Sequence, residues 1–153
     1  MALSVAIESP LQDEVRALVS ELNAHLLSLT PPEFCFHLSV EELAEPDCTL
    51  WVCREHGEAV ACGAMRRHGK RIGEVKRMYT RPEWRGQGIA RRILGEMVDK
   101  AMNEGIETLV LETGDRHPDA WALYEKAGFT RCGPVLDYPN SEFSVFYHKQ
   151  LAA

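Results

Sequence analysis

The sequence predicts a single α/β domain over residues 1–153, in which a twisted mixed β-sheet is flanked by helices. The first observation is size, because 153 residues and 17.2 kDa give one domain with enough chain to bury a core. The second is composition, because 45% hydrophobic and 26% charged residues are close to the average for soluble globular proteins. The third is pattern, because short β-rich segments alternate with segments of helical periodicity.

The N-terminal part of the chain predicts a strand and two helices. Residues Leu3–Ile7 form a short β-rich segment. Apolar residues then recur at helical spacing from Leu11 to Leu29, and Thr30-Pro31-Pro32 ends the pattern. Ser39 offers the N-cap of a short second helix, with Glu42 at the capping-box position.

Three consecutive strands follow and predict an antiparallel meander. They are Thr49–Arg54, Ala59–Arg67 and Arg71–Thr80. The segment Glu55-His56-Gly57-Glu58 separates the first two and has the composition of a hairpin turn. Strands joined by such short turns pair with each other in antiparallel order.

The pattern then switches to the most regular helix of the sequence. Apolar residues from Ala90 to Met102 fall at i, i+3, i+4, i+7, i+8, i+11 and i+12, and Gly105 supplies the stop. The apolar segment Thr108–Thr113 predicts a strand, which completes a strand, helix, strand unit. The remaining predicted elements are a helix over Pro118–Ala127 and two closing strands, Phe129–Cys132 and Phe143–Lys149.

Charge and hydropathy argue against several classes of partner. Seventeen Lys and Arg against 23 Asp and Glu give a net charge of −6, which would repel a nucleic-acid backbone. No apolar run approaches the roughly 20 residues that cross a bilayer, and the N-terminus lacks the features of a signal peptide. We therefore expect neither nucleic-acid nor membrane partners, and a cytoplasmic location.

The cysteines and histidines form no pattern typical of metal or disulfide sites. The five cysteines contain no C-x-x-C pair, and the six histidines contain no H-E-x-x-H motif. We expect reduced thiols that pack as small buried groups on or beside strands, and chemistry that needs no metal. The cysteines are Cys35, Cys48, Cys53, Cys62 and Cys132.

The segment Thr80–Ala90 carries the clearest chemical signal, because a strand runs through a glycine-containing loop directly into the regular helix. Gly86 and Gly88 allow backbone N–H groups to converge, and the helix N-terminus adds unpaired donors and roughly half a positive charge. A three-glycine dinucleotide fingerprint and a Gly-Lys-Ser/Thr phosphate loop are both absent. Phosphate or pyrophosphate is the ligand that this loop predicts.

Two motifs make the sequence resemble the GNAT family of acetyl-CoA-dependent N-acyltransferases. Arg85, Gly88 and Ala90 match the family signature R/Q-x-x-G-x-G/A, and Thr80-Arg81-Pro82 stands where the family tends to have V-x-P. A later A-x-x-L-Y-x-x-x-G-F segment is matched completely, by Ala120, Leu123, Tyr124, Gly128 and Phe129. The resemblance implies a GNAT-like fold whose splayed central strands hold acetyl-CoA.

The resemblance also implies where acetyl-CoA, the cosubstrate, would lie. Pantetheine would pair with strand backbone around Met78, Tyr79 and Thr80, in a gap between Arg71–Thr80 and Thr108–Thr113. Pyrophosphate would lie over Arg85, Gly86, Gln87, Gly88, Ile89, Ala90 and Arg91. His117 replaces an Asn that contacts pantetheine in many family members, so it is a candidate for that contact or for proton relay, with an uninvolved loop histidine as the alternative.

Acetyl transfer to an amine needs an acid and a base. By its family position Tyr124 is the candidate acid, because a phenol with a pKa of about 10 can protonate a thiolate whose conjugate acid has a pKa of about 8.5. The base would deprotonate an amine with a pKa of about 10. Glu74, which period-two alternation places on the face of Met78 and Thr80, resembles the base of histone-acetylating members, and Glu112 competes with it. The alternatives are a core tyrosine and two paired carboxylates.

These observations predict an N-acetyltransferase in which a primary amine of a small molecule or peptide attacks the thioester directly. Glu112 and Tyr138, the latter in the turn-rich segment Asp137–Ser141, are candidate acceptor-binding residues. The family's frequent dimers favour a homodimer. A group of acidic residues favours a cationic acceptor unless it is a solvated face: Glu33, Glu41, Glu42, Glu45 and Asp47.

Two other functions stay open at this point. The chain would be an acyl-CoA-binding regulator if it bound acetyl-CoA without releasing thiol over an amine panel. It would be an anion-binding partner protein, docking a phosphorylated ligand, if it bound no CoA.

Overall fold

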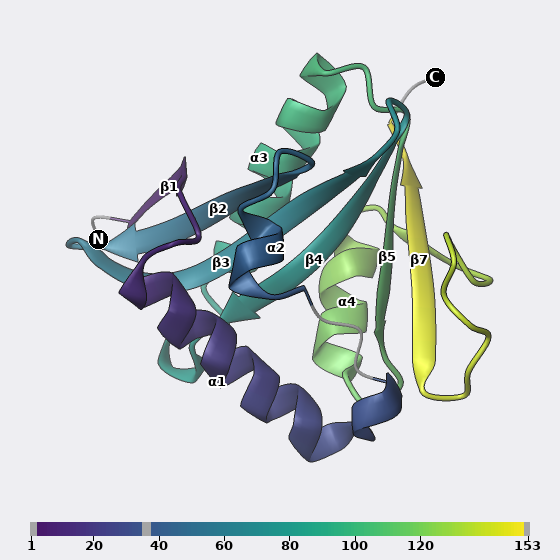
Figure 1. Ribbon diagram of the computed structural model, residues 1–153, viewed down its shortest axis with the longest axis horizontal. Helices are drawn as coiled ribbons and strands as arrows, with labels where there is room; N and C mark the ends of the chain where they lie inside the picture. Colours follow the sequence, from purple (N-terminus) through teal and green to yellow (C-terminus); the bar gives the residue numbers. More distant parts are fainter. Residues whose placement is uncertain (1–2, 35–37, 152–153) are drawn as a thin grey trace.

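The computed structural model describes residues 3–34 and 38–151 and contains a mixed β-sheet with helices on both faces (Figure 1). The strands are β1 (Leu3–Ile7), β2 (Cys48–Glu55), β3 (Glu58–His68), β4 (Ile72–Thr80), β5 (Thr108–Gly114), β6 (Thr130–Cys132) and β7 (Ser144–Gln150). The helices are α1 (Asp13–Leu29), α2 (Val40–Leu43), α3 (Ile89–Asn103) and α4 (Pro118–Lys126), with 3₁₀ turns η1 (Pro32–Phe34) and η2 (Pro82–Trp84). The sheet order in the described chain is β1-β2-β3-β4-β5-β7-β6.

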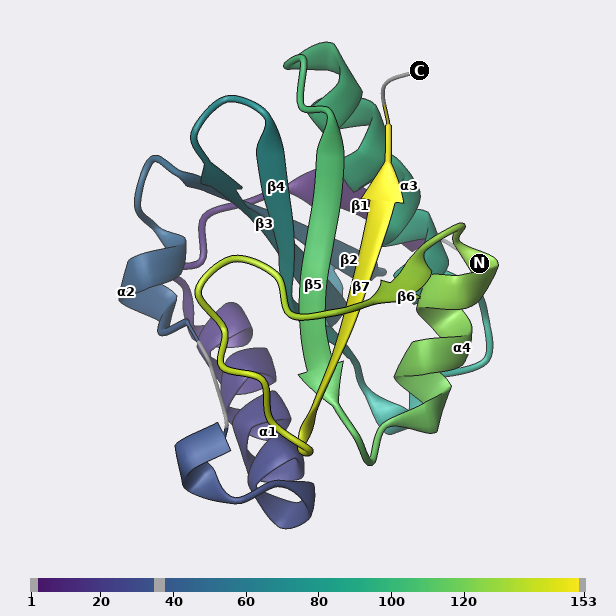
Figure 2. The same cartoon turned by 90° about the vertical axis from the view of Figure 1, so that its right-hand side faces the viewer.

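The two faces of the sheet are covered by different helices. Figure 2 shows α1 and α2 on one side, which we call the α1 face, and α3 and α4 on the other, the α3 face. Each face buries its own apolar cluster. The cluster of the α1 face includes Val15, Leu18, Leu43, Val52 and Tyr79. The cluster of the α3 face includes Val75, Ile93, Met97, Tyr124 and Phe129.

The central strands β4 and β5 pair over only part of their length. They are parallel, and their register runs from Ile72 opposite Thr108 to Glu74 opposite Val110. The other pairings of the described sheet are antiparallel. Beyond Glu74 the two strands diverge, as Figure 1 shows. The sheet therefore opens at the carboxyl ends of β4 and β5, as the family resemblance implied.

A β-bulge in β4 changes which side chains face the gap. Arg77 has a positive φ of 57°, and the β3–β4 register shifts there. After the bulge, Met78 packs into the cluster of the α3 face and Tyr79 into that of the α1 face. The prediction that Glu74 shares a face with Met78 and Thr80 is therefore wrong, because the extra residue breaks the period-two alternation. Glu74 lies on the α1 face.

The predicted secondary structure agrees with the structure to within about two residues at element ends. Ser39 caps α2 in a complete capping box with Glu42, and Gly105 follows α3 with a φ of 82°. The first helix begins at Asp13 rather than Leu11, because its N-cap residue Gln12 has an extended backbone.

Of the described cysteines, Cys53 and Cys62 are buried free thiols, as expected, whereas Cys48 and Cys132 are free thiols that are only partly buried. Cys35 lies outside the described residues. In the described part of the chain, no helix has the length and apolar character that crossing a membrane requires.

Candidate active site

Glu74 is the central ionisable group at the opening between β4 and β5. It is the last residue of β4 that pairs with β5, and it is only 2% exposed. His68 Nε2 lies 2.8 Å from Glu74 Oε1, and Lys76 Nζ lies 3.3 Å from Glu74 Oε2. The Tyr138 hydroxyl donates to Glu74 Oε2. Three polar side chains from three parts of the chain therefore hold this carboxylate.

Tyr138 connects the segment between β6 and β7 to this carboxylate. Lys76 Nζ donates to its hydroxyl at 2.6 Å, and its ring lies 6.0 Å from the Phe146 ring. Burial and then the charge of Glu74 raise the pKa of Tyr138 above its ordinary value, so the hydroxyl stays protonated at neutral pH. The structure thus brings two predicted site residues, Glu74 and Tyr138, into direct contact.

Glu112 lies on the neighbouring strand β5. Its Oε2 accepts a hydrogen bond of 2.7 Å from Ser144 Oγ. Burial raises the pKa of Glu112, whereas the Ser144 hydrogen bond and the charge of Lys76 oppose that shift. The negative charge of Glu74 raises the pKa of Glu112 further, so the two carboxylates interact electrostatically. Glu112 is tied to Ser144 rather than to the network of Glu74.

Tyr124 lies on the opposite face of the sheet from Glu74. Its ring packs in the cluster of the α3 face, 5.7 Å from the Phe129 ring and 6.1 Å from the Tyr147 ring. Burial and then the charge of Glu112 raise the pKa of Tyr124 well above its ordinary value. Among the described residues, none forms a hydrogen bond with its hydroxyl. Tyr124 therefore presents a protonated and unengaged O–H group at neutral pH.

The loop before α3 has the open geometry that an anion site needs. Gly86 and Gly88 have φ values of 79° and 78°, and a Cβ added at either would meet no atom within 4 Å. The Arg92 N–H donates to the Gly88 carbonyl at 3.0 Å, so the N–H groups of Gly88 to Arg91 precede the hydrogen-bonded turns of α3. Arg85 instead braces the loop, because its Nε donates to the Thr80 carbonyl at 2.9 Å.

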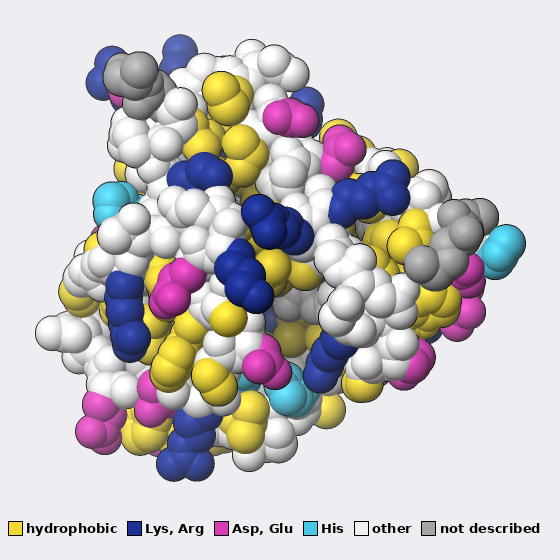
Figure 3. Space-filling view, turned by 180° about the vertical axis from the view of Figure 1, so that it is seen from behind, with side chains coloured by type: hydrophobic (Ala, Val, Ile, Leu, Met, Phe, Trp, Pro, Cys, Tyr) yellow, Lys and Arg dark blue, Asp and Glu magenta, His cyan; other side chains and the backbone are white. Residues whose placement is uncertain are grey.

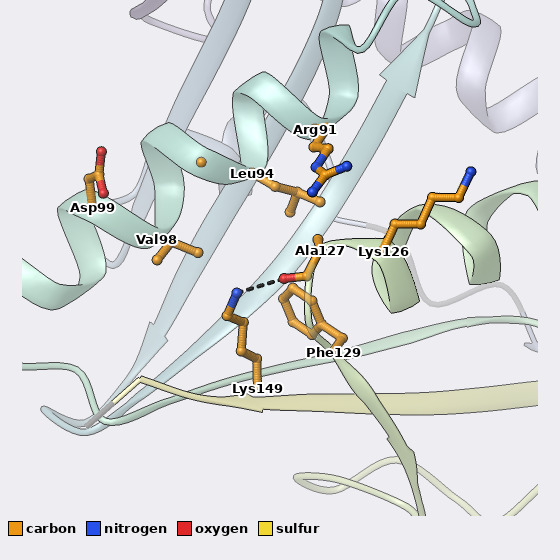
Figure 4. Close-up of a pocket in the computed structure, with 9 residues that line it drawn as sticks. Arg91, Leu94, Val98, Asp99, Lys126, Ala127, Phe129 and Lys149 are labelled. Atoms are coloured by element: carbon orange, nitrogen blue, oxygen red, sulfur yellow. Dashed lines mark hydrogen bonds between the residues drawn. The ribbon is translucent and has the colours of Figure 1, made fainter. Parts of the chain in front are cut away.

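A shallow pocket of about 270 Å³ adjoins the first turns of α3. Arg91, Lys126 and Lys149 line it together with apolar side chains of α3 and Phe129 (Figure 4). Lys149 Nζ donates to the Ala127 carbonyl at 2.6 Å, so it is fixed at the edge of the pocket. Figure 3 shows Lys and Arg side chains gathered around a hollow on this face of the molecule. The lining of the pocket begins at Arg91, directly after the Arg85–Ala90 loop, and it also includes the acidic Asp99.

His117 lies between the carboxyl end of β5 and the start of α4. It is the N-cap residue of α4, and its ring packs over Gly114 and 5.7 Å from the His25 ring of α1. Burial lowers the pKa of His117, and the neighbouring His25 lowers it further, which favours the neutral imidazole. Its buried Nε2 has no hydrogen-bond partner among the described residues.

The predicted acidic cluster is largely engaged in local contacts. Glu41 pairs with Arg16, Glu42 completes the α2 capping box, and Asp47 pairs with Arg66. These contacts favour the alternative of a solvated face over recognition of a cationic acceptor.

The sequence reasoning missed two residues that contact Glu74, His68 and Lys76, and it missed the buried Arg77 next to Lys76 in β4. A signal for Lys76 and Arg77 was present in the sequence, because both interrupt a strand that the predicted topology places at the centre of the sheet. Charged residues are rarely buried without a partner or a role. His68 carries no such signal, since it lies at the end of its strand.

Comparisons with known proteins agree with this geometry. The sequence matches the acetyltransferase (GNAT) family over residues 17–129. It is 41% identical to IAA acetyltransferase of Azospirillum brasilense over 97% of this chain and 98% of that protein. It is 38% identical to the uncharacterised N-acetyltransferase YsnE of Bacillus subtilis over 89% of this chain and 93% of that protein.

A solved structure from Klebsiella pneumoniae, assigned as an acyl-CoA N-acyltransferase, is similar over the whole fold. It has a TM-score of 0.83 and 30% identity, covering 98% of each chain. The fold class and the enzyme class that the sequence predicted are thereby confirmed. The chain belongs to the GNAT family of acetyltransferases.

Proposed function

We propose that this protein transfers the acetyl group of acetyl-CoA to a primary amine of a small molecule or peptide by direct attack. The observation that carries the proposal is the opening between β4 and β5, where Glu74 lies on the α1 face of the sheet and Tyr124 on the α3 face. A thioester in this opening would have a base on one side and an acid on the other. That arrangement suits a reaction in which an amine enters and a thiolate leaves.

Acetyl-CoA is the cosubstrate that the family supports. Fold neighbours from Elizabethkingia anophelis and Thermoplasma acidophilum contain acetyl-CoA and coenzyme A, respectively, with TM-scores of 0.69 and 0.74. In this chain, Gly86 to Arg91 offer the N–H groups for the pyrophosphate. The backbone of Met78, Tyr79 and Thr80, beyond the last β4–β5 pair, is free of β5 and is the proposed partner of pantetheine.

In the proposed reaction, Glu74 removes a proton from the arriving ammonium group. His68 contacts Oε1 of Glu74, and its side chain is 31% exposed. The proton that Glu74 takes up therefore has a route through His68 to solvent. The neutral amine then attacks the thioester carbonyl carbon, and a C–N bond forms as the C–S bond breaks.

Tyr124 donates its proton to the departing sulfur, and the proton lost by the amine nitrogen restores the phenol. The products are an N-acetyl amine, CoA thiol and the proton released through Glu74. His117 is a candidate partner of pantetheine only if its ring leaves its packing on Gly114. The homodimer stays a prediction.

A CoA-thiol release assay over a panel of primary amines, with calorimetry of acetyl-CoA binding, tests the proposed function. Thiol release and binding with micromolar to millimolar constants are expected. Binding without amine-dependent thiol release would instead indicate an acyl-CoA-binding regulator.

Substituting Gly88 by Glu should weaken acetyl-CoA binding at least about tenfold relative to Gly88→Gln. Both side chains pay the same penalty at a φ of 78°, but only Glu adds a negative charge beside the unpaired N–H groups. Calorimetric titration of the two folded variants isolates that charge. Equal acetyl-CoA affinities of the two variants would show that the pyrophosphate does not bind at this loop.

Substituting Tyr138 by Ala should raise the KM for the best amine by about tenfold and change the KM for acetyl-CoA little. The hydroxyl is a hydrogen-bond donor to Glu74, and the ring covers Phe146 on the α1 face. Tyr138→Phe, which keeps the ring, separates the two contributions. An unchanged KM in the Ala variant would exclude this segment from acceptor binding.

A further inference from the structure

Arg77 is a buried cation that has no carboxylate partner among the residues that the structure describes. Its residue is 6% exposed, and its Nη2 donates to the Val19 carbonyl at 3.4 Å and to Asn23 Oδ1. Its Nε has no hydrogen-bond partner among the described residues. The seven residues outside the described ranges carry no Asp or Glu side chain. No acidic side chain therefore remains to neutralise this guanidinium.

This isolation is unusual for an arginine in a protein interior. Buried charges are normally paired or coordinated, because desolvation of an unpaired ion is costly. Burial lowers the pKa of Arg77 to about 10, yet the guanidinium stays protonated at neutral pH. The nearby ammonium of Lys76 is already held by Glu74, so the strand keeps one uncompensated positive charge.

The bulge determines where this charge lies. The positive φ of Arg77 directs its side chain to the α1 face, the face of Glu74 and Lys76. Arg77 is the third residue after Glu74, the last residue of β4 that pairs with β5. Asn23 accepts from Arg77 through Oδ1, which leaves its Nδ2 as a further donor. The N–H groups of Arg77 and Asn23 and the positive charge of Arg77 thus lie on the α1 face. This is the face of Glu74, which is proposed to take the proton from the amine.

We propose that Arg77 binds a carboxylate of the acceptor, so that the acceptor is a small amine that also carries a carboxylate, as a free amino acid does. The inference rests on the proposed function. A carboxylate matches the planar N–H edge of a guanidinium and supplies the single negative charge that the site lacks. The main alternative is that Arg77 only fastens α1 to β4 through Val19 and Asn23.

Two variants separate these roles. Arg77→Met removes the charge and keeps an unbranched apolar stem. Asn23→Asp keeps the shape of the amide but supplies a carboxylate beside the guanidinium. If Arg77 served only to attach α1 to β4, Asn23→Asp would strengthen the contact between residues 23 and 77 and leave acceptor selectivity unchanged. If Arg77 binds substrate, the new carboxylate competes with that of the acceptor while the melting temperature stays equal or rises.

The experiment compares kcat/KM for the standard amino acids and for their carboxamides, which lack the negative charge. Wild type should prefer the best acid over its amide by about 10- to 100-fold, as expected for a hydrogen-bonded charge pair. Both variants should reduce that ratio to within about threefold of one, mainly by losing activity toward the acid. A ratio near one in wild type, or a ratio that both variants retain, would overturn the inference and leave acetyl transfer itself intact.

Absence of thiol release with every amine would contradict the proposed function. Binding of the acceptor would then test whether Arg77 forms a carboxylate site. Calorimetry of the same amino acids and carboxamides with the CoA-saturated protein provides that measurement. Acid-selective binding that is lost in Asn23→Asp supports the carboxylate site, and the absence of acid-selective binding overturns it.

Discussion

At neutral pH, the Glu74→Gln variant should acetylate its best amine with a kcat/KM about 10²- to 10⁴-fold below that of wild type, the range of general base catalysis. An amine with a pKa of about 10 is almost entirely protonated at pH 7, and the amide of Gln cannot accept its proton. Gln keeps the size of the side chain and can still accept from Tyr138 and Lys76. The loss should therefore come from chemistry rather than from folding.

The pH profile identifies the missing proton acceptor. Activity of Glu74→Gln should rise with pH toward the pKa of the free amine, because solvent then supplies the neutral nucleophile. Its deficit relative to wild type should shrink accordingly between about pH 7 and pH 10. Melting temperature and the KM for acetyl-CoA, measured on the same samples, report on any structural change.

Glu112→Gln is the matched control for this experiment. Because burial raises the pKa of Glu112 above 4.5, ionisation of this group costs stability as pH rises from about 4.5 through its folded-state pKa. A neutral amide at this position should therefore fold at least as well at pH 7, and activity should stay within about threefold of wild type. A larger loss in Glu112→Gln than in Glu74→Gln would transfer the role of base to Glu112.

Elements with local signals could be predicted from the sequence. The α2 helix has its capping box within four residues, and the turn at His56 and Gly57 joins two strands that are adjacent in the chain. The helical spacing of apolar residues and the stop at Gly105 predict α3 in the same way, because each of these signals depends on residues only a few positions apart. The loop at Gly86 and Gly88 was found because its backbone requirement is also local.

The face of Glu74 could not be predicted, because the bulge has no sequence signal in this strand. Glycine or asparagine commonly marks a left-handed position, but here an arginine occupies it. The contacts of that arginine with Val19 and Asn23 are 58 and 54 residues away in sequence. The contact between Tyr138 and Glu74 spans 64 residues. Long-range polar contacts of this kind follow from topology and not from periodicity.

The Tyr124→Phe variant should lose about 10²- to 10⁴-fold in the rate of acetyl transfer, and its KM values should change little. The substitution removes only the hydroxyl and keeps the ring that packs against Phe129 and Tyr147. Single-turnover kinetics is the measurement, since slow product release would hide a slower chemical step in kcat. Because burial raises the pKa of Tyr124, the wild-type rate should show no loss of this acid up to about pH 10.

Tyr147→Phe controls for the loss of a buried hydroxyl in the same aromatic cluster. The Tyr147 hydroxyl donates to Glu125 of the α4 helix at 2.6 Å and has no role in the proposed reaction, so its removal should leave the transfer rate within about twofold of wild type. If Tyr124→Phe also stays within about twofold, water or another group protonates the thiolate. Tyr124 would then be a core residue whose unengaged hydroxyl has no catalytic role. A large loss in Tyr124→Phe alone assigns the donated proton to the phenol of Tyr124 rather than to any hydroxyl of this aromatic cluster.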